Sequence, residues 1–61
     1  MGDIALLTVA EAADIMRVSK MTVYNLIHSG HLQTIRIGRS LRVLETSVLS
    51  YLGEMAQVDW T

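Results

Sequence analysis

Apolar residues recur at helical spacing near the start of the chain and predict a first helix over residues 9–17. They lie at Val9, Ala12, Ala13 and Met16, which fall on one helical face. Thr8 precedes this run and Glu11 follows three residues later. This spacing predicts a capping box, in which each side chain accepts a hydrogen bond from the other residue's backbone N–H. Arg17 would close the helix, where a cation suits the helix dipole.

A second amphipathic segment predicts another helix, beginning after Ser19 and ending before Gly30. Its apolar stripe is preceded by Val18 and consists of Val23, Leu26 and Ile27. Its opposite stripe consists of Lys20, Met21, Tyr24, Asn25 and His28. Only Arg17 and Val18 separate the first helix from the Ser19 cap. So short a joint makes the two helices cross steeply, as in a helix-turn-helix.

The pattern then changes to strand-like alternation. Residues 33–37 and 41–44 are rich in β-branched and aliphatic side chains, and Gly38, Arg39 and Ser40 interrupt them. The segment therefore predicts a β-hairpin.

Two registers of this hairpin are possible. A two-residue loop places Ile35 opposite Arg42, whereas a three-residue loop places Ile35 opposite Val43 and Arg36 opposite Arg42. We prefer the three-residue loop because it alone keeps one face wholly apolar, although such loops usually place glycine last. Arg36 and Arg42 would then lie side by side on the outer face with Arg39 at the tip, and an anion would offset their repulsion.

A third helix is predicted from Thr46, its expected N-cap, with Val48, Leu49 and Leu52 on the inner side. Gly53 would weaken its end. We expect one domain over residues 1–61, with a core at 7–52 and a short tail at 53–61 that includes Trp60. The expected fold is mainly α with a small β-hairpin, a winged helix-turn-helix.

Composition narrows the class of protein. The chain has 61 residues, 51% of them hydrophobic, and no cysteine, so neither a disulfide nor a thiolate metal site is expected. No apolar run approaches the ~20 residues of a membrane span, and the N-terminal segment lacks the pattern of a signal peptide. We therefore expect a cytoplasmic protein.

Charge is segregated along the chain, although the net charge is only -1. The five basic residues are consecutive in the order of charges, and acidic residues precede and follow them: Arg17, Lys20, Arg36, Arg39 and Arg42. A basic middle between acidic ends indicates a polyanion as partner. A solvated charged face would have the same charge order.

Other function classes fit less well. His28 and His31 lack a third metal ligand beside them, and neither a phosphate loop nor a nucleophile–base pair occurs. We expect no enzyme, catalytic residue, metal or cofactor. A protein-interaction module could use Met21 and the apolar tail, but it leaves the arginine-rich hairpin unexplained. RNA or single-strand binding lacks an aromatic stacking platform on the strands.

Three segments carry a resemblance to a known family: "LTVAEAADIMRVSKMTVYNLIHSGHL", "IRIGRSLRV" and "VLSYL". Their order resembles the small winged helix-turn-helix family of phage excisionases and BldC-like regulators, which is related to the DNA-binding domain of MerR proteins. The resemblance implies that the second helix enters the major groove and that the hairpin, the wing, meets the neighbouring backbone or minor groove. Relatives commonly have proline at Gln33–Thr34 and often arginine at Asn25.

The chemistry of individual side chains agrees with this resemblance. Hydroxyls at Ser19 and Thr22 lie at a helix N-terminus that favours phosphate. Asn25 can bind adenine bidentately, and Arg39 suits an A·T-rich minor groove. The predicted DNA-binding residues are Arg17, Ser19, Lys20, Thr22, Tyr24, Asn25, His28, Arg36, Arg39 and Arg42.

We expect double-stranded DNA as the partner. The resemblance further implies cooperative self-association on DNA, an integrase as a further partner, and association with the nucleoid of a prokaryotic or phage-infected cell. Neither a membrane nor a small-molecule substrate is expected. Two functions compete: an excisionase that bends attachment-site DNA, and a small BldC-like transcription regulator. The small size favours the excisionase slightly.

Overall fold

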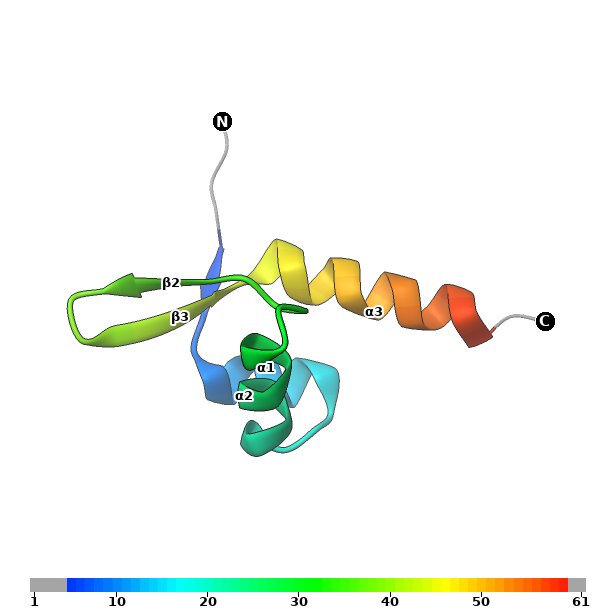
Figure 1. Ribbon diagram of the computed structural model, residues 1–61, viewed down its shortest axis with the longest axis horizontal. Coiled ribbons are helices and arrows are strands. Elements are labelled where there is room, and N and C mark those ends of the chain that lie inside the picture. Colours follow the sequence, from blue (N-terminus) through cyan, green and yellow to red (C-terminus); the bar gives the residue numbers. More distant parts are fainter. Residues whose placement is uncertain (1–4, 60–61) are drawn as a thin grey trace.

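The structure, a computed structural model, describes residues 5–59, and the side chains of residues 5–55. Within that range the elements are β1 (Leu6–Leu7), α1 (Val9–Met16), α2 (Lys20–His28), β2 (Thr34–Ile37), β3 (Ser40–Leu44) and α3 (Glu45–Asp59). The strands form an antiparallel sheet in the order β1-β3-β2. The β2–β3 wing extends from one end of the molecule and α3 from the other (Figure 1). This architecture confirms the predicted winged helix-turn-helix fold.

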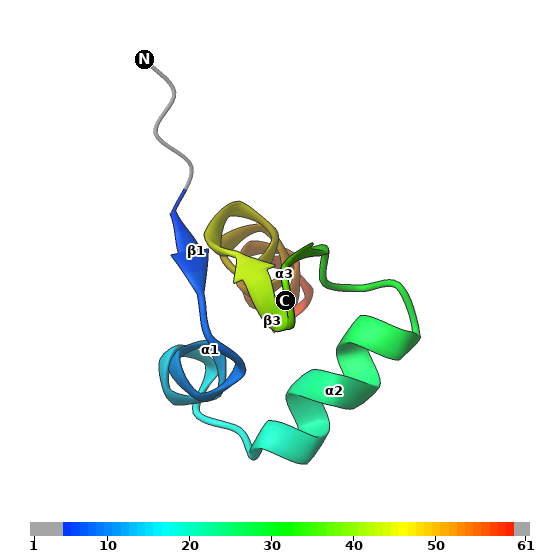
Figure 2. The same ribbon diagram turned by 90° about the vertical axis from the view of Figure 1, so that its left-hand side faces the viewer.

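The helix-turn-helix forms as its caps predict. The Thr8 N–H donates to Glu11 Oε1 at 2.9 Å, and the Glu11 N–H donates to Thr8 Oγ1 at 3.0 Å, which completes the capping box. The Thr22 N–H donates to Ser19 Oγ at 3.1 Å at the start of α2. Figure 2 looks along α1 and across α2, so the two helices cross steeply.

A small core joins the helices to the sheet. The buried residues of the described range are Val9, Ala12, Ala13, Val23, Leu32, Val43 and Val48. Every helix and β3 contribute to this cluster. Ala12 is fully buried, and its small side chain lets neighbouring elements approach α1 closely.

The register of the wing corrects the sequence-based prediction. Arg36 lies opposite Leu41 and Ile35 opposite Arg42, so the loop has two residues, Gly38 and Arg39. The predicted three-residue loop is wrong. Gly38 has φ +60°, which is the conformation that a type II′ hairpin turn requires at its first loop position. Turn chemistry decided the register because the wing extends beyond the core, where burial of one face exerts no control.

This register separates the two strand arginines. Residues directly opposite each other share a face, and the face alternates along each strand. Arg36 therefore shares its face with Leu41 and the buried Val43, whereas Arg42 shares the other face with Ile35 and Ile37. The predicted pair of adjacent arginines and the predicted wholly apolar face are both wrong.

The third helix also differs from its prediction. It begins at Glu45, so Thr46 lies inside it and is not the N-cap. Ser47 fixes the start of α3 to its neighbours. Its Oγ donates to the Leu44 carbonyl oxygen at 2.8 Å and accepts from the Gln33 N–H at 3.1 Å. Gly53 does not end the helix, which continues to Asp59.

The inner side of α3 was predicted in part. Val48 is fully buried and Leu52 packs against the core, but Leu49 is 55% exposed, and Tyr51 packs in its place. Residues 53–59, predicted as a tail, belong to the helix. Trp60 lies outside the described residues. Strand β1 was not predicted; Leu6 pairs with Leu44 and Leu7 with Val43.

Candidate nucleic-acid interface

Helix α2 presents the polar stripe that the sequence predicted. All of its members are exposed, and they are Lys20, Met21, Tyr24, Asn25 and His28. Met21 is 71% exposed. Val23 on the reverse side is fully buried, and Leu26 and Ile27 pack against the core. The helix is therefore anchored by one face and offers the other to a partner.

The N-terminus of α2 combines a cap with two hydroxyl groups. Ser19 Oγ lies 3.0 Å from Thr22 Oγ1 and accepts the Thr22 N–H. Ser19 is thus a structural cap whose side chain is exposed. The first-turn amides of a helix and its dipole favour an anion at this end.

Arg17 occupies an unusual backbone conformation next to this end. It is the C-cap of α1 with φ 61° and ψ 44°, the left-handed region that favours glycine. Its backbone N–H bonds to the Asp14 carbonyl oxygen at 3.2 Å, and its side chain is exposed. The turn therefore places a cation where glycine would be less strained.

The wing distributes its arginines over two faces and a tip. Arg39 is exposed in the loop, and Arg36 is exposed on the face that continues from the core-facing Val43. Arg42 is half-buried on the opposite face, where its Nη1 donates to the Leu41 carbonyl oxygen at 3.1 Å. Arg36 thus lies on the core-facing side of the wing and Arg39 at its tip, whereas Arg42 lies on the opposite face.

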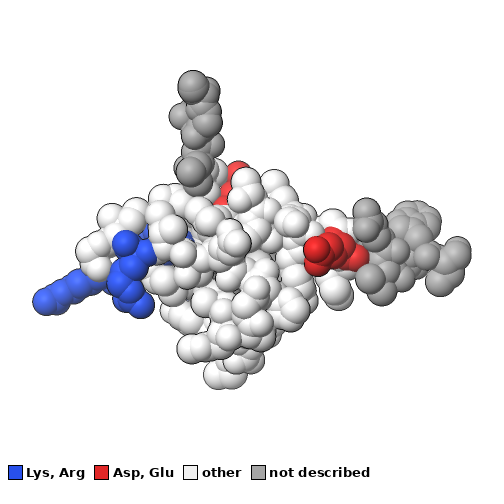
Figure 3. All heavy atoms as spheres, turned by 45° about the horizontal axis from the view of Figure 1, so that its top comes forward, with Lys and Arg blue, Asp and Glu red and all other residues white. Residues whose placement is uncertain are grey.

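Charge is polarised along the molecule. In the view of Figure 3, basic side chains gather over the wing end, and acidic side chains lie over the opposite end and at the top. In sequence terms, the wing carries three arginines and no acid, whereas α3 carries acids and no base. The three arginines of the wing thus form a basic end of the fold, whereas Arg17 and Lys20 lie at the turn between α1 and α2 (Figure 1).

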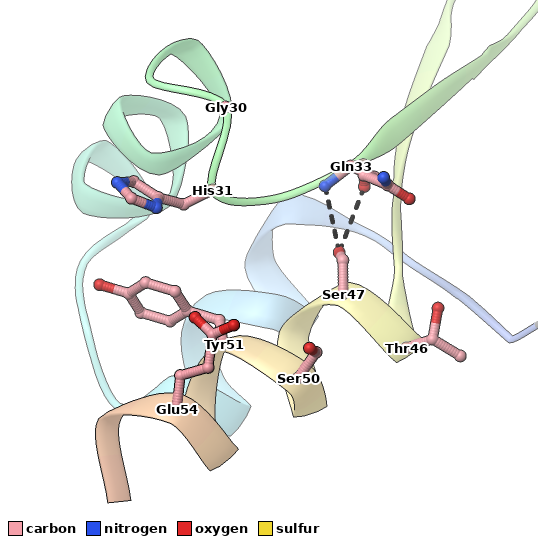
Figure 4. Close-up of a pocket in the computed structure, with 8 residues that line it drawn as sticks. All are labelled: Gly30, His31, Gln33, Thr46, Ser47, Ser50, Tyr51 and Glu54. Carbon is pink, nitrogen blue, oxygen red and sulfur yellow. Dashed lines mark hydrogen bonds between the residues drawn. The ribbon is translucent and has the colours of Figure 1, made fainter. Parts of the chain in front are cut away.

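A hollow that the sequence did not predict lies between α3 and the α2–β2 connection (Figure 4). Its volume is ≈ 370 Å³, and it is lined by Gly30, His31, Gln33, Thr46, Ser47, Ser50, Tyr51 and Glu54. The His31 and Tyr51 rings lie 5.6 Å apart between centroids, tilted by 55°. The sequence pattern did not predict this hollow, because its lining comes from two segments that are separate in sequence and because the predicted third helix ended before Glu54.

In the part of the chain that the structure describes, His, Asp and Glu residues do not gather in groups of three or more suited to a metal ion. No helix in that part is both long and apolar enough to cross a membrane.

Comparison with known proteins adds to this geometry. The helix-turn-helix domain family matches residues 6–56. A Mycobacterium tuberculosis protein named "Putative DNA-binding protein Rv0500A" is 68% identical over 38 residues, which cover 62% of this chain and 49% of that protein. "Uncharacterized protein YvgK" of Bacillus subtilis is 40% identical over 55 residues, which cover 90% of this chain and 18% of that protein.

The match thus spans about half the length of the Mycobacterium protein and under a fifth of the Bacillus protein. No solved structure matches the chain significantly.

Proposed function

Because the chain belongs to the helix-turn-helix domain family, we propose that it binds double-stranded DNA with α2 in the major groove and the wing on the adjacent backbone. The observation that carries this proposal is the exposed polar stripe of α2 over a buried apolar one. An α-helix fits the major groove, and a stripe of Lys, Tyr, Asn and His offers both phosphate and base contacts. Arg36 and Arg39 extend this surface.

The side chains divide into reading and positioning roles. Asn25 is exposed near the middle of α2 and can bind adenine N6 and N7 bidentately. Lys20 lies at the start of the helix, where a point charge serves the phosphate backbone. The complete proposed set is Arg17, Ser19, Lys20, Thr22, Tyr24, Asn25, His28, Arg36 and Arg39. Arg42 lies on the opposite face of the wing and is not part of this surface.

We propose further that several copies bind cooperatively along repeated sites. A single module of this size buries only about 600–1,000 Å² on DNA. That area is small for tight specific binding by one copy. Self-association on DNA would add the missing free energy.

The biological role that we propose is that of an excisionase, which bends attachment-site DNA and assists an integrase. The resemblance to phage excisionases supports this role, and a small BldC-like transcription regulator is the alternative. An excision assay with the integrase encoded nearest to the gene tests the choice. Increased excision supports the excisionase, whereas a changed promoter reporter without any effect on excision supports the regulator.

Binding to a short random duplex at several salt concentrations tests DNA binding itself. We expect the logarithm of the binding constant to fall linearly with log[salt], with a slope of about -0.9 for each phosphate neutralised. Affinity that does not depend on salt would contradict the proposal and favour a protein-interaction module.

A further inference from the structure

The most exposed large apolar side chain that the structure describes lies on the polar stripe of α2. Met21 is 71% exposed, and the other members of the stripe are Lys20, Tyr24, Asn25 and His28. A single exposed apolar residue is ordinary on a protein surface. This one, however, lies on the face that α2 would turn toward the base pairs, and the DNA contacts proposed above leave it without a partner.

Met21 occupies a position in α2 from which base edges can be reached. It is the second residue of the helix, which begins at Lys20. In a helix-turn-helix the N-terminal residues of the recognition helix contact the base edges. The backbone on either side is held, because the Thr22 N–H bonds to Ser19 Oγ at 3.1 Å and Val23 is fully buried. The unbranched side chain of methionine can still adjust its shape to a contact.

We propose that Met21 reads the C5-methyl group of a thymine in the major groove. This inference rests on the proposed DNA binding. The methyl group is the apolar feature that a thymine presents in the groove, and apolar side chains are what recognises it. Lys20, Asn25 and His28 recognise hydrogen-bonding groups instead. A contact between Met21 and the methyl group would remove both apolar surfaces from water.

Asn25 gives the thymine a place in the binding site. Met21 and Asn25 are four positions apart in the sequence, so they lie on one face of α2, separated by about one helical turn of 5.4 Å. Successive base pairs are about 3.4 Å apart. A helix that lies along the groove therefore places this thymine one or two base pairs from the adenine that Asn25 would bind.

Deoxyuridine tests the contact directly, because it pairs as thymidine does and lacks only the C5-methyl group. The wild-type protein first selects its preferred sequence from random duplexes of about 15 base pairs, near one and a half turns. Each thymidine of that sequence is then replaced singly by deoxyuridine. We expect one replacement to weaken binding about fourfold, the effect of one methyl group left in water. Asn25→Ala locates the neighbouring adenine in the same sequence.

Substitution of Met21 identifies the side chain that reads the methyl group. Met21→Ala should weaken binding to the thymidine duplex and bind the two duplexes equally. Because Met21 is exposed, this variant should unfold at the same temperature as the wild type. Met21→Leu keeps an apolar side chain and should still prefer thymidine.

A matched control uses another exposed methionine. Met55 on α3 is 51% exposed and lies outside the α2 stripe. Met55→Ala should keep the preference for thymidine at its full size. Loss of the preference in both alanine variants would show that it does not depend on a contact of Met21, and would overturn the proposal.

The remaining failures are distinguishable. Absence of wild-type binding to every duplex overturns the proposed function and, with it, this inference. Binding in which no thymidine differs from deoxyuridine, including binding without sequence preference, overturns this inference alone. A methyl effect of the same size in Met21→Ala also overturns it, because another residue would then read the methyl group.

Discussion

Replacing Arg39 with alanine is the sharpest test of the wing as a DNA contact. The side chain is exposed in the two-residue loop between β2 and β3. If it neutralises one phosphate, its loss changes the slope of log K against log[salt] by about 0.9. Between about 50 and 200 mM salt, the affinity ratio of wild type to variant should then shrink by about 3.5-fold.

The same substitution should leave the fold intact. Gly38 supplies the positive φ of the turn, and Arg39 is not among the residues with positive φ. Surface replacements of this kind change the free energy of unfolding by about 0.5 kcal/mol or less. A loss of affinity without a loss of stability would assign Arg39 to binding.

The assay pairs fluorescence anisotropy on a short duplex with thermal unfolding in the absence of DNA. Arg39→Lys is the control, because it keeps the charge and should keep the salt slope. An unchanged slope in Arg39→Ala, or unfolding of that variant, would refute the reasoning and make the wing a structural element.

Four further predictions follow from the same geometry. Arg36→Ala should not raise the midpoint of thermal unfolding, because Leu41, not Arg42, lies opposite it; a clear rise would restore the like-charge pair and the other register. In binding to a panel of duplexes, Asn25→Ala should relax preference at one base position at a cost of ~1–3 kcal/mol, and Lys20→Ala should weaken all sequences about equally; the reverse pattern would exchange their roles. Gly38→Ala should destabilise the protein by about 1–2 kcal/mol in denaturant unfolding, because its φ is +60°, and a neutral result would contradict the turn. Arg17→Gly should stabilise by about 1 kcal/mol by relieving a left-handed arginine while weakening DNA binding, and unchanged affinity would remove Arg17 from the interface.

Local signals predicted the helix-turn-helix correctly. The Thr8–Glu11 capping box and the Ser19 cap are determined by residues three apart in sequence, and the structure shows both. The two stripes of α2 likewise follow from helical spacing, which places Val23 in the core and Asn25 outside. Interactions of this range need no knowledge of the rest of the chain.

The wing register could not be settled in the same way. The sequence-based prediction assumed one apolar face along the whole hairpin. Only the base of the hairpin packs against the core, where Val43 is buried. Further out, Ile35 and Ile37 are exposed, so burial does not select a register there. Gly38 at the first loop position determines the register, because its positive φ suits a two-residue turn.

The start of α3 and the hollow depended on long-range contacts. Ser47 bonds to Gln33, fourteen positions away, and Glu45 donates its backbone N–H to the Ala5 carbonyl oxygen at 3.1 Å. These contacts hold the start of the helix at Glu45, so Thr46 lies inside the helix and does not cap it. The sequence pattern contains no trace of such pairings, so Thr46 was the reasonable but wrong choice.

The composition of the core has a consequence for the lifetime of the protein. Among the described residues the buried set contains only valine, alanine and leucine, and a chain of about 60 residues is marginally stable. Duplex present at 100 times Kd would add about 2.7 kcal/mol to the free energy of unfolding. The unfolded fraction of copies without DNA is therefore about a hundred times larger than that of bound copies, and unfolded chains are open to proteases. Turnover of surplus molecules would thereby match the amount of protein to the number of its DNA sites, with no separate regulator.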